Sequence, residues 1–284
     1  GRGIQIMEPA VGRLTGKDSG PGRMPEPEEI YAQVTQLLNA PEVSPATAGP
    51  LAGRTVVVTA GGTREPLDPV RYLGNRSSGK QGVALALEAA AAGAQVHLIA
   101  GVMDIQAPDE QSNLSVERIE TADQLQAAVL TAAEDADVLL MAAAVADFKP
   151  ADYAAAKIKK TDDGASPVIT LQRNPDILAD TVQRRAQQHR GPKVIVGFAA
   201  ETGDASTDPL ELAQQKLARK GCELLVLNKV GENLVFGQDT TEIYILAADH
   251  VQQNLGETQA EHVAGSKQEA AAAVVARAAQ LLRS

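Results

Sequence analysis

From residue 51 onwards, short β-branched apolar runs alternate with Ala- and Leu-rich amphipathic segments, and this rhythm limits the possible folds more than any other feature. Residues 55–59 (TVVVT) are typical of a strand buried on both faces. Such alternation predicts an α/β fold, Rossmann-like and doubly wound, with a mostly parallel sheet and ligands at the carboxyl ends of its strands. The remaining predicted strands are 95–100, 115–119, 138–141, 194–198, 224–227 and 242–246, and the last of these precedes the final helix. The predicted helices are 79–92, 122–134, 175–188, 209–220 and 267–282, and the helix at 175–188 has Pro at its first turn.

Two segments depart from this rhythm. Residues 1–50 are rich in Gly, Pro and charge, with a short amphipathic helix predicted at about 28–38 and a linker composition at 41–50. We therefore place a domain boundary near Leu51, so that residues 51–284 form the main domain. The second segment, 145–173, carries KIKK at 157–160 and a strand-like run at 168–171, and we interpret it as an inserted basic flap.

Composition excludes several classes of function. The chain has no Trp and 2% aromatic residues, whereas proteins that bind single-stranded nucleic acid stack bases on aromatic side chains. Its formal net charge of −10 is opposite to a nucleic-acid footprint. The single cysteine, Cys222, allows neither an intramolecular disulfide nor a thiolate zinc cluster, which fits a cytoplasmic compartment. No apolar run reaches the roughly 18 residues of a membrane helix. We expect no nucleic-acid or membrane partner.

Two loops carry candidate binding groups. Residues 60–82 place glycines, hydroxyls and cations before a predicted helix, whose N-terminus suits a phosphate; alternatively, Ser77 or Ser78 merely caps that helix. The KIKK run concentrates positive charge in an acidic protein, which favours an anionic ligand such as a triphosphate; the alternative is a solvated basic loop.

Four further candidates stand near strand exits or on a helix. Asp147 follows a strand that ends in small residues, and it either holds a magnesium–phosphate group or caps a turn. The segment 173–178 (RNPDIL) either reads a base or phosphate with its N–H groups or is an ordinary capped helix start with Pro at its first position. Phe198 packs either on a base or in the core. Lys216 and Lys220, spaced i, i+4, either reach phosphates or lie on a solvated helix face.

Taken together and in this order, five motifs resemble the phosphopantothenate–cysteine ligase family, also called phosphopantothenoylcysteine synthetase. They are TAGGTREPLDPVRYLGNRSSGKQG, AAAVADFKP, KIKK, RNPDIL and GFAAET, and they cover the chain from about residue 51 to its end. In bacteria this ligase is usually the C-terminal half of a bifunctional coenzyme A biosynthesis flavoprotein. The segment MEPAVGRLTGKDSGPGRMPEP resembles the substrate clamp of the fused phosphopantothenoylcysteine decarboxylase, whose Cys would fall at Gly16. We expect no decarboxylase activity and no flavin in this piece.

The resemblance implies CTP-dependent ligation of L-cysteine to (R)-4′-phosphopantothenate through an acyl-cytidylate, with Mg²⁺. It also implies a homodimer that shares the pantothenate site, with the basic flap closing over it, and a flavin-binding decarboxylase domain in a longer parent.

The matched positions take roles from the same resemblance. Asn75 and Arg71 would handle the pantothenate and its acyl intermediate, Lys157 would stabilise charge at the transferred phosphate, and Asp147 would meet the metal–triphosphate. Ala143 would contribute backbone contacts. The implied nucleotide-binding positions are Gly61, Ser77, Gly79, Gly82, Met141, Ala142, Ala143, Asp147, Lys157, Pro175, Asp176, Ile177, Leu178, Phe198, Lys216, Lys220 and Asn228.

Two other functions compete with this one. Tyr153 and Lys157 match the Tyr-x-x-x-Lys pair of a short-chain dehydrogenase, an NAD(P) oxidoreductase, but residues 59–64 do not supply the glycine-rich loop of that class. A non-catalytic nucleotide-binding module would keep the Gly/Ser loop and would need neither Asn75 nor Lys157.

Overall fold

The computed structural model describes residues 10–13, 19–25, 27, 30–31, 49–159, 166–201, 208–229, 240–255 and 260–283. It divides the chain into two compact units, residues 1–44 and 45–284. In the first unit, β1 (Ala10–Arg13) pairs antiparallel with β2 (Ser19–Arg23). Gly16 lies outside the described residues. Most of the predicted helix at 28–38 and most of the predicted linker at 41–50 also lie outside them.

The second unit is built on an eight-stranded sheet in the order β14-β13-β12-β11-β8-β3-β6-β7. Neighbours from β12 to β7 run parallel, whereas β13 and β14 are antiparallel additions at one edge. The prediction of an α/β, mostly parallel sheet is confirmed. The strands are β3 (Thr55–Ala60), β6 (Gln95–Ala100), β7 (Leu114–Arg118), β8 (Val138–Met141), β11 (Val194–Glu201), β12 (Leu224–Lys229), β13 (Thr240–Ala247) and β14 (Glu261–Ser266).

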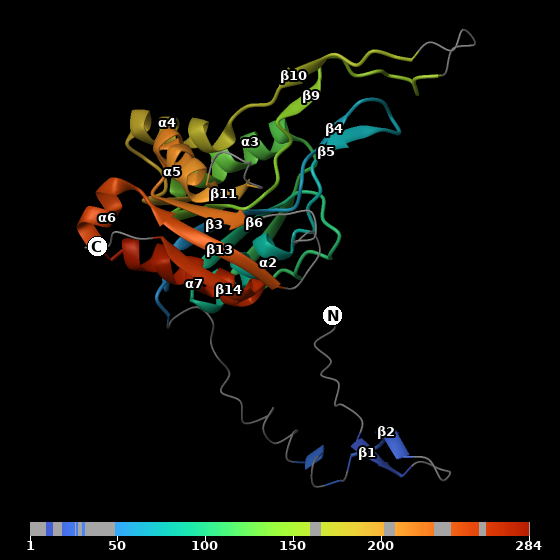
Figure 1. Ribbon diagram of the computed structural model, residues 1–284, viewed down its shortest axis with the longest axis vertical. Coiled ribbons are helices and arrows are strands. Elements are labelled where there is room, and N and C mark those ends of the chain that lie inside the picture. The colour runs from blue at the N-terminus through green and yellow to red at the C-terminus, as the bar shows by residue number, and fades with distance from the viewer. Residues whose placement is uncertain are drawn as a thin grey trace. The chain divides into compact units, whose positions relative to one another are not determined.

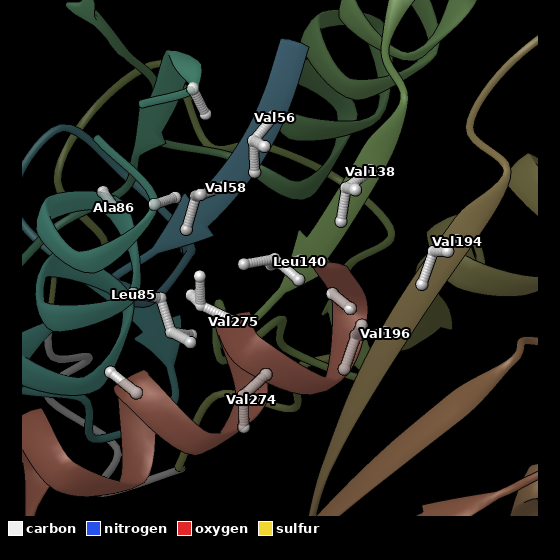
Figure 2. Close-up of a cluster of buried hydrophobic side chains, with 14 of the residues drawn as sticks. Val56, Val58, Leu85, Ala86, Val138, Leu140, Val194, Val196, Val274 and Val275 are labelled. Atoms are coloured by element: carbon white, nitrogen blue, oxygen red, sulfur yellow. The ribbon is translucent and has the colours of Figure 1, made fainter. Parts of the chain in front are cut away.

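Helices cover both faces of the sheet (Figure 1). On one face lie α2 (Lys80–Ala91) and α7 (Lys267–Leu281), and on the other lie α3 (Ala122–Ala132), α4 (Ile177–Gln188) and α5 (Pro209–Lys220). Figure 2 shows side chains of β3, β8 and β11 facing those of α2 and α7 across the first of these two cores. With both faces covered, the central strands are apolar throughout, as their sequences predict.

Local sequence sets where the helices begin and how closely they pack. Capping boxes start α3, through Thr121 and Gln124, and α7, through Ser266 and Glu269. Gly82 lets α2 approach the end of β3, because a Cβ there would lie 2.5 Å from the Cβ of Ala60. This close packing brings the start of α2 to the carboxyl edge of the sheet.

Several predicted boundaries are wrong. Strand β14 and the short helix α6 (Asp249–Leu255) follow β13, which is therefore not the last strand. The sequence of β14, EHVAGS, lacks an apolar pattern because it is a half-exposed edge strand. Helix α4 begins at Ile177 with Asp176 as its N-cap, so Pro175 precedes the helix instead of opening it.

Two short antiparallel pairs project beyond the helical layers (Figure 1). One is β4 (Arg64–Pro66) with β5 (Tyr72–Gly74), in a segment predicted to be a loop. The other is β9 (Phe148–Pro150) with β10 (Leu171–Arg173), which forms the base of the predicted flap. The flap strand lies at 171–173 and not at 168–171, since Val168 is 92% exposed and unpaired in the sheet. Both pairs rise from the edge where the parallel strands end. Among the described residues, no helix is long and apolar enough to cross a membrane.

Candidate functional site

A cavity of about 680 Å³ opens at the carboxyl ends of β8 and β11, within the size range of small-molecule sites. It is the crevice that a doubly wound sheet offers to ligands. The predicted residues that line it are Asn75, Met141, Ala143, Asp147, Pro175, Asp176, Ile177, Leu178, Phe198, Lys216 and Lys220.

The small-residue loop that follows β8 is fixed by two buried threonines. The Oγ1 of Thr59 accepts the N–H of Ala143 at 3.1 Å, and the Oγ1 of Thr63 accepts the N–H of Ala146 at 3.0 Å. Both threonines are at most 1% exposed. These bonds fix the backbone of the loop, and a ligand can approach it closely because its own side chains are small.

Asn75 and Asp147 approach the cavity from the two loops beside β8. The Nδ2 of Asn75 donates to the backbone oxygen of Val145 at 2.9 Å, which holds its amide against the small-residue loop. Asp147 is exposed at the rim of the cavity, two residues further along. Asn75 and Asp147 therefore line the same cavity.

Asn174 is a cavity residue that the sequence analysis did not select. Its backbone N–H donates to the oxygen of Asp147 at 2.9 Å, and its Nδ2 donates to the oxygen of Ala146 at 2.8 Å. Its Oδ1 is buried without a hydrogen-bond partner. Asn174 thus ties the start of the RNPDIL segment to the loop that carries Asp147. Only the strand-to-helix position of this segment hinted at such a role.

An ion pair between Asp176 and Lys220 forms the opposite wall of this cavity. Asp176 accepts the N–H of Ala179 as the N-cap of α4, and its Oδ2 pairs with the Nζ of Lys220 on α5. Burial raises the pKa of Asp176, but the hydrogen bonds from Lys220 and Ala179 and the charges of Lys220 and Arg219 outweigh it, so that its pKa is lowered. The carboxylate is ionised at neutral pH, and it neutralises Lys220 in part.

A second cavity of about 180 Å³ shares a wall with the first, since both are lined by Ala143, Ala144, Phe198, Ala199 and Ala200. It is lined by five more predicted residues and by two cations that were not predicted. The former are Ser77, Gly79, Gly82, Ala142 and Asn228, and the latter are Arg76 and Lys267.

The second cavity lies at the N-terminus of α2. The N-cap is Gly79, in a left-handed conformation with no side-chain cap, so the alternative that Ser77 or Ser78 caps this helix is wrong. Backbone N–H groups at an uncapped helix start suit an anion, and Arg76 and Lys267 add positive charge nearby. Phe198 packs against the core, one of its two predicted alternatives, and also lines both cavities.

Three predicted residues do not line either cavity. Gly61 forms a turn with φ +80°, where a Cβ would meet the Cγ of Met103 at 2.7 Å, and its oxygen accepts the N–H of Ala144. Arg71 pairs with Asp68 in the loop between β4 and β5. Lys157 is exposed on the flap. Within one chain, therefore, Lys157 does not join Asn75 and Asp147, and Lys160 lies outside the described residues.

Two other chemistries can be judged from the same geometry. Tyr153 and Lys157 lie in irregular structure and not on the helix that carries this pair in a short-chain dehydrogenase, which argues against that alternative. Cys222 is buried, and burial raises the pKa of its thiol to about 11, which removes it as a nucleophile at neutral pH.

A metal would have to be held with few protein ligands. Among the residues that the structure describes, no three His, Cys, Asp or Glu side chains gather as a metal site. Mg²⁺ commonly binds through one or two carboxylates and the phosphates of a nucleotide, and Asp147 at the rim of the cavity fits that mode.

Comparison with known proteins gives one family and several relatives. Residues 51–281 match the family described as the DNA/pantothenate metabolism flavoprotein C-terminal domain. The chain is 52% identical over 255 residues to the coenzyme A biosynthesis bifunctional protein CoaBC of Mycobacterium bovis, which covers 89% of this chain and 60% of that protein. The chain therefore spans about 60% of the length of that curated relative.

Solved structures share the fold. The crystal structure of the C-terminal domain of a CoaBC protein is 28% identical with a TM-score of 0.62, and the match covers 83% of this chain and 99% of that one. A Cab2 variant in complex with phosphopantothenate-cysteine is 18% identical with a TM-score of 0.63, covering 91% of this chain and 96% of that one, and at this identity only the fold is comparable.

Proposed function

Because the chain belongs to the family of DNA/pantothenate metabolism flavoprotein C-terminal domains, we propose that residues 51–284 are a phosphopantothenate–cysteine ligase that acts in coenzyme A biosynthesis. The observation that carries this proposal is the pair of adjoining cavities. One is large enough for a nucleoside and a carboxylic acid and has Asn75 and Asp147 at its edge, and the other has an uncapped helix start and two cations. A substrate with a long polyanionic tail fits this arrangement.

In the first proposed step, the carboxylate of 4′-phosphopantothenate attacks the α-phosphate of CTP, pyrophosphate leaves, and an acyl-cytidylate forms. Both reactants are anionic, so they must be held together against their repulsion. The start of α2, with Arg76 and Lys267, would hold the phosphate chain, and Lys216 and Lys220 would complete the nucleotide site. Lys157 would stabilise the charge that develops at the α-phosphate.

In the second step, the amine of L-cysteine attacks the acyl carbonyl and expels CMP. The amide of Asn75 has two hydrogens, and one of them binds Val145. The other can donate to the acyl carbonyl oxygen, which becomes more negative as the amine attacks. The bond to Val145 fixes the amide in this orientation before the substrate arrives.

Asp147 would hold Mg²⁺ bound to the triphosphate. The ion would neutralise negative charge on the phosphates, and the exposed position of Asp147 leaves room for phosphate oxygens and waters in its coordination shell. We assign no other described carboxylate to it, since Asp176 pairs with Lys220.

A second copy of the chain would complete the site. Large apolar side chains are exposed on the two projecting strand pairs and the flap: Val70, Tyr72, Phe148, Tyr153, Val168 and Leu171 are each 47% to 92% exposed. Such a patch is typical of a protein–protein interface. In a homodimer built on this patch, Lys157 would reach the cavity of the partner. In a longer parent, a flavin-binding decarboxylase domain would precede the ligase, in the cytoplasm.

The test is a pyrophosphate-release assay with each of the four nucleoside triphosphates. We expect release with CTP when phosphopantothenate is present, without any need for cysteine, and release of CMP only after cysteine is added. Binding of CTP without turnover, under all combinations of substrates, would instead favour the non-catalytic nucleotide-binding module.

A further inference from the structure

The basic flap is fastened to the rest of the fold at Ile158, and the group that fastens it is a carboxylate that lines neither the main nor the second cavity. Asp68 lies in the loop between β4 and β5 and is 2% exposed. A buried carboxylate is costly unless its oxygens are fully engaged, so its partners show what it is there to do.

The two oxygens of Asp68 have separate partners. Its Oδ1 accepts the backbone N–H groups of Val70 and Arg71, each at 2.8 Å, and thereby closes the local turn. Its Oδ2 accepts the N–H of Ile158 at 3.2 Å and lies 2.9 Å from the Nη2 of Arg71. One oxygen therefore builds the loop, and the other reaches 90 residues along the chain to the flap.

Ile158 is held on both of its backbone polar groups. While Asp68 accepts its N–H, the Nη2 of Arg71 donates to its carbonyl oxygen at 2.6 Å. A third bond, from the N–H of Ala154 to the oxygen of Leu67 at 3.0 Å, joins the same two segments. The lysines on either side of Ile158, at 157 and 159, are exposed. The peptide is fixed while its charged neighbours stay free to meet an anion.

The charge of Asp68 persists at neutral pH. Burial raises its pKa, but the hydrogen bonds from Val70, Ile158 and Arg71 and the charge of Arg71 together lower it. The carboxylate thus remains an acceptor in both directions under the conditions in which the protein works.

We propose that Asp68 is a positioning residue that fixes the flap at Ile158 and so determines where Lys157 is presented. For the role of Lys157 this inference rests on the proposed ligase function. A cation held in place before the reaction need not be ordered during it, which is how positioning lowers an activation barrier. The Asp68–Arg71 pair would order the flap of its own chain. This holds whether Lys157 enters the cavity of the same chain or that of a second copy.

The first measurement is hydrogen exchange of the Ile158 amide in the full chain and in Asp68→Asn. The asparagine side chain keeps one oxygen that can accept the N–H groups of the local turn. Its NH2 group then faces two other donors, the N–H of Ile158 and the guanidinium of Arg71, so that both lose their acceptor. We expect the Ile158 amide to exchange faster by about tenfold or more, the amount that a lost hydrogen bond to a charged group predicts. The amides of β3 should exchange as before, which reports that the variant is folded.

The second measurement separates positioning from general destabilisation. In pyrophosphate release, Asp68→Asn should lower kcat by roughly 10- to 100-fold, as a displaced catalytic group does, with the KM for CTP nearly unchanged. In a chain that already carries Lys157→Gln, the same change should add little further loss, because the two residues act as one unit. Equal losses in both backgrounds would overturn the inference.

Matched variants complete the design. Asp123→Asn removes an ion pair of 2.6 Å to Lys149 in the flap base, but Asp123 is 62% exposed and does not touch Ile158, so its kcat should be that of the parent. If Asp68→Asn does not fold, Asp68→Ser retains an acceptor for the turn and loses the reach to the flap. Unchanged exchange at Ile158 in the folded variant refutes the clamp, whereas a parent chain that releases no pyrophosphate refutes the proposed function and leaves the exchange result standing.

Discussion

The cavity and the flap are held in place in different ways. At the cavity, the small-residue loop follows β8 of the parallel sheet, and its backbone is bonded to the buried side chains of Thr59 and Thr63. The flap has one short pair of strands at its base and a few bonds around Asp68, and it exposes the side chains that a core would normally cover. The cavity is thus enclosed by its own chain, whereas under the proposed function the flap would be completed by a second copy.

This difference indicates a division of roles. Under the proposed function, the groups that would contact the nucleotide lie beside strands whose close packing fixes the backbone, because small displacements there are costly. Under the same proposal, Lys157, which would meet both substrates, lies exposed on the flap. The comparison makes opposite predictions for similar substitutions in the two regions.

The largest contrast should come from a matched pair of leucines. Leu140 on β8 is 1% exposed in the core of Figure 2, whereas Leu171 on β10 is 47% exposed. Leu140→Ala should lower the free energy of unfolding by about 2–5 kcal/mol, the cost of a buried cavity. Leu171→Ala should change it by about 0.5 kcal/mol or less, as exposed positions do, but weaken dimer formation. Urea unfolding and sedimentation measure the two effects.

Protein concentration is the control for that pair, because unfolding of a dimer depends on it. If Leu171→Ala destabilised the chain as much as Leu140→Ala at a concentration where both are monomeric, the flap would have to be part of the core, and the comparison would be wrong.

The next contrast separates the two chemical steps. Lys157→Gln should lower pyrophosphate release by about 100-fold or more, because it removes one donor from the developing charge. Asn75→Asp should leave that step largely intact and slow the second, since a carboxylate beside the oxygen of Val145 cannot donate to an acyl carbonyl. Single-turnover assays should then show accumulated acyl-cytidylate in Asn75→Asp alone.

The exposed Lys159→Gln is the matched control for the flap. Equal loss of both steps in Lys157→Gln and Asn75→Asp would contradict the separate roles.

The sheet was largely predictable from sequence because its strands bury both faces. Runs such as TVVVT at 55–59 are apolar or β-branched throughout, which is the sequence pattern of a strand buried on both faces. Strand β14 was not predictable, since an edge strand with one half-exposed face and Gly265 lacks that signal. The start of α4 was predicted two residues too early, because Asp176 is the N-cap of this helix and Pro175 therefore precedes it.

Site residues could be predicted from the sequence where their position relative to the strands marks them. They could not be predicted where they act through hydrogen bonds to the backbone. Asp147 follows β8 and Phe198 lies in the second half of β11, and the alternation of strands and helices locates both positions. Thr59, Thr63, Asp68 and Asn174 work by accepting or donating to backbone groups far along the chain, and only coordinates reveal those partners.

A smaller effect tests the rigidity of the cavity wall. Thr63→Val keeps the shape of the side chain but leaves the buried N–H of Ala146 without its acceptor. We expect the free energy of unfolding to fall by about 1–3 kcal/mol, the cost of an unsatisfied buried group. Thr131→Val, on the exposed surface of α3, is the control and should show a much smaller change. A loss of similar size in the control would mean that the loop is not fixed by Thr63.

The smallest effect concerns the ion pair on the opposite wall. The pKa of Asp176 is lowered from 3.8 in the folded chain, so its charge stabilises the fold fully above the unfolded pKa and loses this effect as pH falls through the folded one. Asp176→Asn should therefore cost less than about 1 kcal/mol at pH 7, since the pair is partly exposed. The difference from the parent should shrink below pH 4, and urea unfolding at neutral and acidic pH measures it. Because Asp68, in the loop between β4 and β5, also has a lowered pKa, Asp68→Asn should show the same sign. A difference that grows on acidification in either variant would mean that its carboxylate is not the stabilising form.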